Sequence, residues 1–267
     1  MSTSVSVLDA FDHLIPTYQV WMTDLNREES DENKKQNQPK VHPSGNTTKK
    51  QEPPPPRLLL THETDHELTK KATDLLYVER KEPASRLKIE YVASVPGHLR
   101  AEADVSRFSD LYLVHPVSVA LGAKFPQTEI EVWPEWHHED VRVDCSFRSM
   151  KSTAGNPATS VAMAIEYKKA GYLEIDHFKE GFKSSLGGDQ VPQLMKDTNS
   201  LTFLKQATAY AERYRTDFIA LFDYRTLILL RFQKNRLAAS TVFVEPESFC
   251  KALLGFAIIA GEAKGWE

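Results

Sequence analysis

The chain has 267 residues, of which 41% are hydrophobic and 26% charged, so it can bury a core and is not a wholly disordered protein. Lys and Arg number 33 against 37 Asp and Glu, which gives a net charge of −4 and excludes nucleic-acid binding through bulk positive charge. Two cysteines, Cys145 and Cys250, are too few for a disulfide-stapled secreted domain or a multi-cysteine zinc module.

The N-terminal residues, 1–26, predict a helical segment because apolar residues such as Val7 and Phe11 recur at helical spacing. Residues 27–56 contain six basic and five acidic residues and end in four prolines. This composition predicts a disordered linker that ends in a stiff polyproline spacer. The main domain should then span residues 57–267, with the N-terminal helix tethered to it and available to a protein partner.

Hydrophobic periodicity in the main domain predicts an alternation of helices and strands. The expected helices are 67–77, 104–121, 200–214 and 246–260, and the expected extended segments are 87–95, 128–133, 141–147, 161–167, 217–222 and 226–232. This order predicts an α/β fold with a central mixed sheet flanked by helices. The longest apolar run near the C-terminus is too short for a membrane span and no signal peptide is evident. We therefore expect an intracellular protein of the nucleus or cytoplasm that contacts no membrane.

Two neighbouring predicted strands carry charged residues within apolar runs. Glu166 and Lys168 are two positions apart and therefore share one face of their strand, while Tyr167 lies on the other face. Asp144 lies on the polar face of the preceding strand, so strand pairing would bring it beside them. Two carboxylates and an ammonium group could bind a divalent cation and orient a water molecule. The alternative is a solvated salt bridge at the end of a strand.

The next predicted helix carries Gln206 and Tyr210, which lie i and i+4 on one face. The order of Asp144, Glu166-Tyr167-Lys168 and these two residues resembles the PD-(D/E)XK nuclease superfamily, in particular its RecB-like branch. Segments 142–144, 164–169, 203–206 and 218–223 look like those of fungal nuclease-like domain proteins. The resemblance covers residues 104–232, about half of the chain, and implies a restriction-endonuclease-like core.

The resemblance also implies roles for the matching residues. Asp144 and Glu166, with the backbone carbonyl of Tyr167, would bind Mg²⁺ or Mn²⁺. Lys168 would position the attacking water, and because its head should face a cleft we expect it to contribute little to folding.

Residues on two helices would complete this site. Gln206 would brace the site or touch the substrate backbone, and Tyr210 follows it. The family often supplies a further acid from the first helix, where Glu102 and Asp104 are available. Of these two we select Asp104 as a metal ligand.

Two other histidine-containing segments favour a structural interpretation. His62-Glu63-Thr64-Asp65-His66 matches H-E-x-x-H, but it follows the polyproline linker, has no evident third ligand and indicates a polar helix start. A zinc protease is therefore the least favoured hypothesis. His137 and His138 indicate a polar surface turn between two strands.

The sequence supports two hypotheses for the function. The first is a Mg²⁺-dependent phosphodiesterase, a nuclease, acting on DNA or RNA. The alternative is a catalytically inactive nuclease-like module that binds nucleic acid or a protein. Positive charge near the site would come from Lys168, Lys169, Lys179, Lys183, Lys196 and Lys205, unless these are ordinary solvated lysines.

Overall fold

The protein is described by a computed structural model that covers residues 2–13, 15–18, 54–61, 65–92, 97–138, 141–153, 156–185, 195 and 198–267. The strands are β1 (Ser2–Ser6), β2 (Leu58–Thr61), β3 (Lys88–Val92), β4 (Ile130–His138), β5 (Val141–Thr153), β6 (Asn156–Tyr167), β7 (Phe218–Phe222), β8 (Leu227–Phe232) and β9 (Ala238–Val244). The α-helices are α1 (Val7–Asp12), α3 (His66–Thr73), α4 (Lys81–Arg86), α5 (Glu102–Ser109), α6 (His115–Lys124), α7 (Ile175–Ser185), α9 (Thr198–Arg213) and α10 (Phe249–Ala263). No helix in these ranges has both the length and the apolar character needed to cross a bilayer.

A mixed seven-stranded sheet forms the centre of the fold, in the order β2-β9-β8-β7-β6-β5-β4. The strands β4, β5 and β6 pair antiparallel, and β7 lies parallel to β6. The strands β7, β8 and β9 again pair antiparallel, and β2 closes that edge parallel to β9. The predicted α/β class with a central mixed sheet is therefore confirmed.

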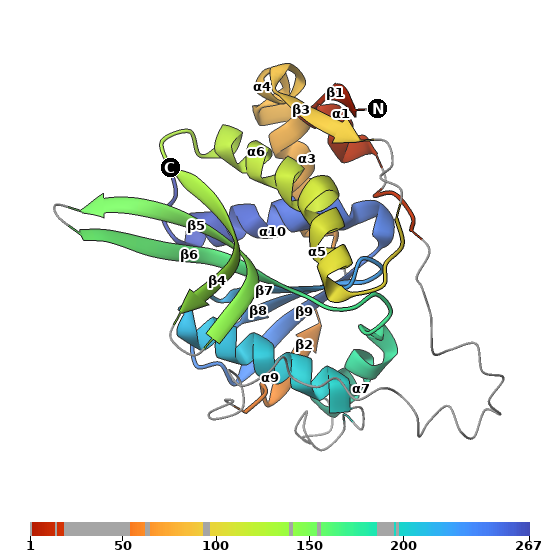
Figure 1. The fold of residues 1–267 in the computed structure, drawn as a ribbon. Coiled ribbons are helices and arrows are strands. Elements are labelled where there is room, and N and C mark those ends of the chain that lie inside the picture. Colours follow the sequence, from red (N-terminus) through yellow and green to blue (C-terminus); the bar gives the residue numbers. More distant parts are fainter. Residues whose placement is uncertain are drawn as a thin grey trace.

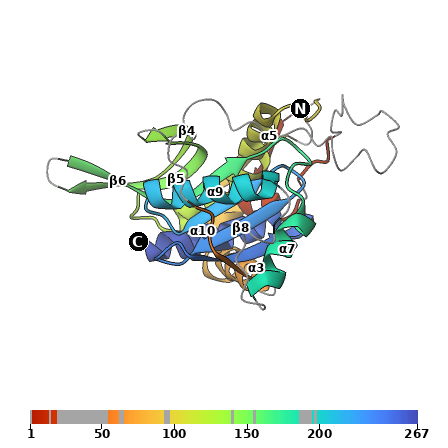
Figure 2. The same ribbon diagram turned by 90° about the horizontal axis from the view of Figure 1, so that it is seen from below.

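Helices cover both faces of the sheet, with α3, α6 and α10 on one side and α7 and α9 on the other (Figures 1 and 2). The central strand β7 explains this arrangement, because all five of its residues are buried. Phe218 and Phe222 belong to the apolar core beneath α10, whereas Ile219 and Leu221 belong to the core beneath α9. The alternation of side chains along a strand thus divides the apolar residues between two cores.

The outer part of the β5–β6 hairpin extends away from the body of the protein (Figure 1). β4 pairs with β5 only as far as Ser149, and β7 pairs with β6 only from Met163 onward. From these limits to the hairpin turn, no other described strand pairs with β5 or β6.

The predicted helix 104–121 consists of three pieces, α5, a π-helical segment (Asp110–Val114) and α6. Pro116 explains the interruption, because it has no N–H to donate to the carbonyl of Tyr112 four residues earlier. The thiol of Cys250 on α10 donates to that carbonyl at 3.3 Å. The Cys250 thiol therefore supplies the Tyr112 carbonyl with a hydrogen bond that Pro116 cannot donate.

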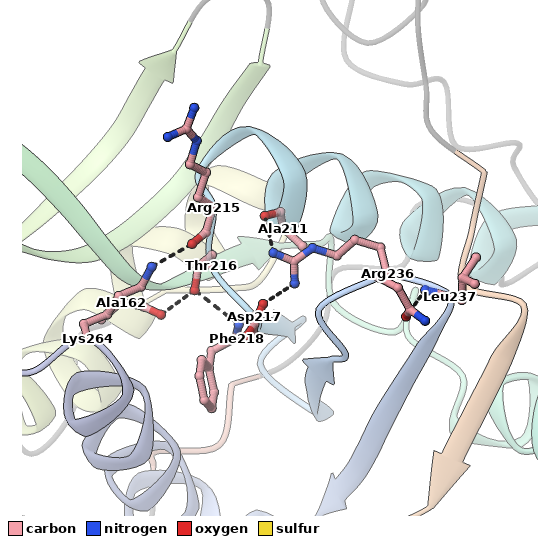
Figure 3. A network of polar contacts seen from close by, with 10 residues as sticks. Ala162, Ala211, Arg215, Thr216, Asp217, Phe218, Arg236, Leu237 and Lys264 are labelled. Atoms are coloured by element: carbon pink, nitrogen blue, oxygen red, sulfur yellow. Dashed lines mark hydrogen bonds and ion pairs between the residues drawn. The ribbon is translucent and has the colours of Figure 1, made fainter.

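A polar network at the C-terminal end of α9 fixes this helix to the sheet (Figure 3). Arg236, in the β8–β9 turn, forms an ion pair with Asp217 and donates to the carbonyl of Ala211 at 3.1 Å. The hydroxyl of Thr216 donates to the carbonyl of Ala162 on β6. These bonds connect the end of α9 to both parallel strands and so determine where its inner face lies.

The predicted tethered helix over 1–26 is present only in part within the described residues, and residues 19–26 lie outside them. Residues 2–6 form β1, which pairs antiparallel with β3, and the helix α1 begins only at Val7. Ser6 and Asp9 form a capping box there, which gives this boundary a local cause. The side chain of Phe11 is buried in the core. These residues are therefore packed into the main domain.

The structure also changes other sequence expectations. The proposed linker 27–56 lies outside the described residues except for 54–56. His137 and His138 belong to β4, so the predicted turn at these residues is wrong. β4 is an edge strand of the sheet, a position that tolerates proline, and the strand continues past Pro134.

Candidate functional site

The predicted carboxylates meet where β5 and β6 separate. In the antiparallel register Cys145 lies opposite Ile165, which brings Asp144 alongside Glu166. Beyond this pair, Asp144 Oδ2 accepts a hydrogen bond of 2.8 Å from the backbone N–H of Tyr167. β6 meanwhile continues beside β7 up to Tyr167. The site therefore lies at the carboxyl ends of two parallel strands, which are frequent positions for ligand sites in α/β sheets.

Glu166 and Lys168 form a buried ion pair. Lys168 Nζ lies 2.5 Å from Glu166 Oε1, and each residue is only 5% exposed. The second carboxylate oxygen, Glu166 Oε2, is buried without a hydrogen-bond partner in the described part of the chain. Burying an oxygen of a charged carboxylate in this way is costly unless another group compensates it.

The electrostatics of the cluster indicate a shortage of positive charge. Burial, together with the charge of Glu166, raises the pKa of Asp144 from 3.8 to about 9, although Lys168 acts in the opposite direction. Burial alone would lower the pKa of Lys168, but the charges of Glu166, Glu102 and Asp144 raise it instead. At neutral pH, Lys168 is therefore charged and Asp144 holds a proton.

Three residues on the inner face of α9, Phe203, Gln206 and Tyr210, cover this cluster. Phe203 places its ring centroid 5.2 Å from Lys168 Nζ. Burial, followed by the charges of Glu166 and Asp144 and by the approach of the hydroxyl to the Glu166 carboxylate, raises the pKa of the Tyr210 hydroxyl well above 10. Tyr210 therefore lies within electrostatic reach of the predicted site.

Gln206 lies one turn before Tyr210 on the inner face of α9 and is 2% exposed. Its Oε1 is buried without a hydrogen-bond partner among the residues that the structure describes. Gln206 thus has an amide oxygen that remains available to a water molecule or a ligand.

The two acids of the first helix have different environments. Asp104 Oδ2 accepts hydrogen bonds from the backbone N–H groups of Arg100 and Ala101, at 2.9 and 3.0 Å, and so caps the start of α5. Glu102 is exposed, but partial desolvation and the charge of Glu166 raise the pKa of its carboxyl, while Lys168 lowers it. The structure therefore brings Glu102, and not Asp104, into the cluster.

A capping role for Asp104 had a signal in the sequence, because the third position of a helix commonly holds an acid that reaches back to the N-cap backbone. The capping contacts therefore differ from the metal-ligand role expected for Asp104.

Asp223 positions the backbone beside the site, a role that its place at the end of segment 218–223 does not predict. Its Oδ2 accepts from the N–H groups of Gly171 and Leu173, and its Oδ1 from those of Arg225 and Thr226, all between 2.8 and 3.0 Å. Asp223 is completely buried. Its carboxyl therefore connects the chain that follows Lys168 to the turn after β7.

The donor set fits a hard divalent cation better than a soft one. Asp144 and Glu166 offer carboxylate oxygens, one of them buried without a partner, and Mg²⁺ commonly takes one or two carboxylates and keeps several waters. Within the described ranges, no three acidic, imidazole or thiol side chains gather into a ready-made metal site. Protein ligands alone would not complete the coordination, so water or a substrate oxygen would be needed.

Other predicted features lie outside the site or outside the described residues. Residues 62–64 of the H-E-x-x-H segment are not described, and α3 begins at His66. Lys196 is likewise not described, and Lys179 forms an exposed ion pair of 3.6 Å with Asp176.

Comparison of the chain with protein-family models, with curated proteins and with solved structures found no match.

Proposed function

We propose that this protein is a metal-dependent phosphodiesterase that cleaves DNA or RNA. The observation that carries the proposal is the cluster of Asp144, Glu166 and Lys168, in which two neighbouring carboxylates share one ammonium group. One carboxyl keeps a proton with a pKa near 9 and the other keeps a buried oxygen without a partner in the described chain. A divalent cation would supply the missing positive charge.

The arrangement of the elements supports a restriction-endonuclease-like core. A helical region, α5 and α6, precedes the antiparallel strands β4, β5 and β6, and α9 then leads to β7, parallel to β6. This order agrees with the sequence resemblance, which rests on residues of β5, β6, α9 and β7.

Each residue of the cluster has a role that suits its position. Asp144 and Glu166 would hold Mg²⁺ or Mn²⁺, with the Tyr167 carbonyl as a further ligand and Glu102 close by. The bound cation would activate water and stabilise charge on the phosphate. Lys168, fixed by Glu166, would orient the attacking water, and Gln206 would offer its free amide oxygen to that water or to the substrate.

The proposal is tested by incubating the full chain with labelled DNA and RNA, in Mg²⁺, Mn²⁺ or EDTA. We expect cleavage that requires the metal and is lost in Asp144→Asn. Asp176→Asn is the matched control, because the side chain of Asp176 is 94% exposed and forms an ion pair with Lys179 at the surface. Equal cleavage by the parent and Asp144→Asn would contradict the proposal.

One observation favours the catalytically inactive module as the second candidate. Lys168 already neutralises Glu166 at 2.5 Å, so the cluster needs only one proton, on Asp144, to persist without metal. Binding of nucleic acid or protein by the parent without cleavage in either metal would support this candidate.

A further inference from the structure

The edge strand β4 presents an exposed aromatic ring close to the candidate site. The side chain of Trp133 is 43% exposed and is therefore among the most accessible large hydrophobic residues of the described chain. An isolated exposed apolar residue needs no special explanation. The contacts of this ring nevertheless distinguish it from an ordinary surface residue.

Two neighbours hold the Trp133 ring in one orientation. The indole Nε1–H donates to Glu131 Oε2 at 2.8 Å, and the guanidinium carbon of Arg148 lies 3.3 Å from the ring centroid. Arg148 is itself 3% exposed and lies 3.3 Å from the same oxygen of Glu131. The cation thus packs against one face of the indole, and the carboxylate fixes both partners.

The strand register places this ring on the same sheet face as the carboxylate cluster. Trp133 lies opposite Ser146 on β5, and Ser146 lies opposite Ala164 on β6. Residues directly opposite one another share a face, and residues two apart along a strand share it as well. Trp133 is therefore a diagonal neighbour of Asp144, at about 7–8 Å for such a pair.

We propose that Trp133 is a stacking platform for an unpaired base of a nucleic-acid substrate, so that the protein acts on single-stranded DNA or RNA. This inference rests on the proposed function and specifies its substrate class. An exposed aromatic face is the feature on which single-stranded nucleic acids stack their bases, whereas bases within a duplex already stack on one another. The guanidinium of Arg148, itself paired with Glu131, supports the inner face of the indole and leaves the other face for a base.

The position next to the site gives the platform a function beyond affinity. A base held on Trp133 would place a phosphate of a neighbouring nucleotide near Asp144 and Glu166. Rigid aromatic side chains suit this role, because few rotatable bonds have to be fixed when the base binds. The ring would therefore determine which phosphate enters the cluster.

Binding is measured with the full chain in EDTA, by fluorescence anisotropy of a labelled single-stranded oligonucleotide, the corresponding duplex and a strand of the same length without bases. Trp133→Leu should weaken binding of the single strand by roughly 5- to 150-fold, the range found when a stacking aromatic is removed. Trp133→Phe should retain most of the affinity. Leu237→Ala, which truncates an exposed apolar residue beside the opposite sheet edge, should leave it unchanged.

The strand without bases provides a test that does not depend on a stable variant. The parent should bind it more weakly than the ordinary strand, and Trp133→Leu should bind the two strands equally. Equal affinity of the parent and Trp133→Leu for the ordinary strand would overturn the inference and leave the nuclease proposal intact. Equal weakening of duplex and single-strand binding would also overturn it. A parent that neither binds nor cleaves any nucleic acid would overturn both proposals together.

Discussion

The backbone N–H of Tyr167 donates a hydrogen bond of 2.8 Å to the carboxyl of Asp144 on the neighbouring strand. The Asp144 carboxyl thus accepts from a backbone N–H just beyond the last pair of β5 and β6, Cys145 with Ile165. This bond fixes one oxygen of Asp144 relative to Glu166, the residue before Tyr167. The two carboxyl groups are thus positioned next to each other by the backbone itself.

The proton on Asp144 predicts an unusual dependence of stability on pH. Because the pKa of Asp144 rises from 3.8 to about 9 on folding, its contribution to stability is complete below about pH 4 and is lost as the pH rises through 9. Asp144→Asn remains neutral throughout. We expect the free energy of unfolding of Asp144→Asn, minus that of the parent, to increase by up to about 1.4 kcal/mol for each pH unit between pH 5 and 8.

The measurement is urea unfolding in EDTA at several pH values, with the parent and the variant compared at each. Groups that do not interact with Asp144 contribute equally to both proteins, so the difference between the two curves reports this carboxyl and the groups coupled to it. A constant difference from pH 5 to 8 would mean that Asp144 is ionised across the range.

The same proton should oppose the binding of a divalent cation. A cation that binds Asp144 has to displace the proton, so stabilisation by Mg²⁺ or Mn²⁺ should increase between pH 6 and 9. At a free metal concentration of one hundred times Kd, the free energy of unfolding would rise by roughly 2.7 kcal/mol. The measurement is the melting temperature with and without metal. Glu166→Gln should reduce the shift and Asp176→Asn should not. A shift that is absent in both metals, or unchanged in Glu166→Gln, would exclude this metal site.

Strand patterns made much of the site predictable. β5 and β6 are long runs in which charged residues interrupt apolar ones, so the shared face of Asp144, Glu166 and Lys168 could be inferred from alternation alone. The choice between Glu102 and Asp104 could not be made in this way. The choice depends on the backbone just before α5, because Asp104 accepts from the N–H groups of Arg100 and Ala101 there.

Elements that depend on distant partners were missed. β2 is a run of four residues without alternation, and it is a strand because it pairs with β9 about 180 residues later in the chain. Val7 and Phe11 lie in α1, as their helical spacing predicts, but residues 2–6 of the predicted helical segment form a strand that pairs with β3. In both cases tertiary pairing overrode a weak local preference.

Asp223 should be important for stability as well as for the position of the site. Asp223→Ala would leave four backbone N–H groups without their acceptor in a fully buried position, so we expect a loss of about 3–5 kcal/mol in the free energy of unfolding. Asp223→Asn, which exchanges one accepting oxygen for a donor, should lose less. Chemical denaturation checks both, with Asp176→Asn as a control near zero. A loss below about 1 kcal/mol in Asp223→Ala would contradict this role.

Gly255 allows α10 to pack closely against α3. A Cβ atom there would lie 2.0 Å from the carbonyl oxygen of Leu68, so Gly255→Ala has to push α10 away from α3. We expect a loss of about 1–3 kcal/mol or more, typical of an overpacked core. Gly122→Ala on α6 is the matched control, because nothing lies within 4 Å of its added Cβ. It should be neutral or slightly stabilising, since alanine favours a helix over glycine. Equal melting temperatures for the two variants would contradict the packing of α3 on α10.

Lys168 should affect both stability and catalysis, and the two effects can be separated. The structure corrects the expectation that this lysine contributes little to folding, because it is 5% exposed and paired with Glu166 at 2.5 Å. Lys168→Met would leave Glu166 buried without its counter-charge, which typically costs about 3–5 kcal/mol. The double variant Lys168→Met with Glu166→Gln removes both charges and should recover much of this loss.

Cleavage should follow a different pattern, measured at a temperature where every variant is folded by circular dichroism. If Lys168 orients the attacking water, Lys168→Met should reduce the rate by roughly 10²- to 10⁴-fold, the range for a positioned acid–base group. The double variant should remain as inactive as the single one although it is more stable, because the cation-binding Glu166 is also lost. Lys168→Arg should retain the ion pair and the fold but orient the water poorly, because its planar guanidinium has a different shape from an ammonium group. Cleavage that returned in the double variant together with stability would show that Lys168 only maintains the fold, and full cleavage in Lys168→Met would exclude it from the reaction.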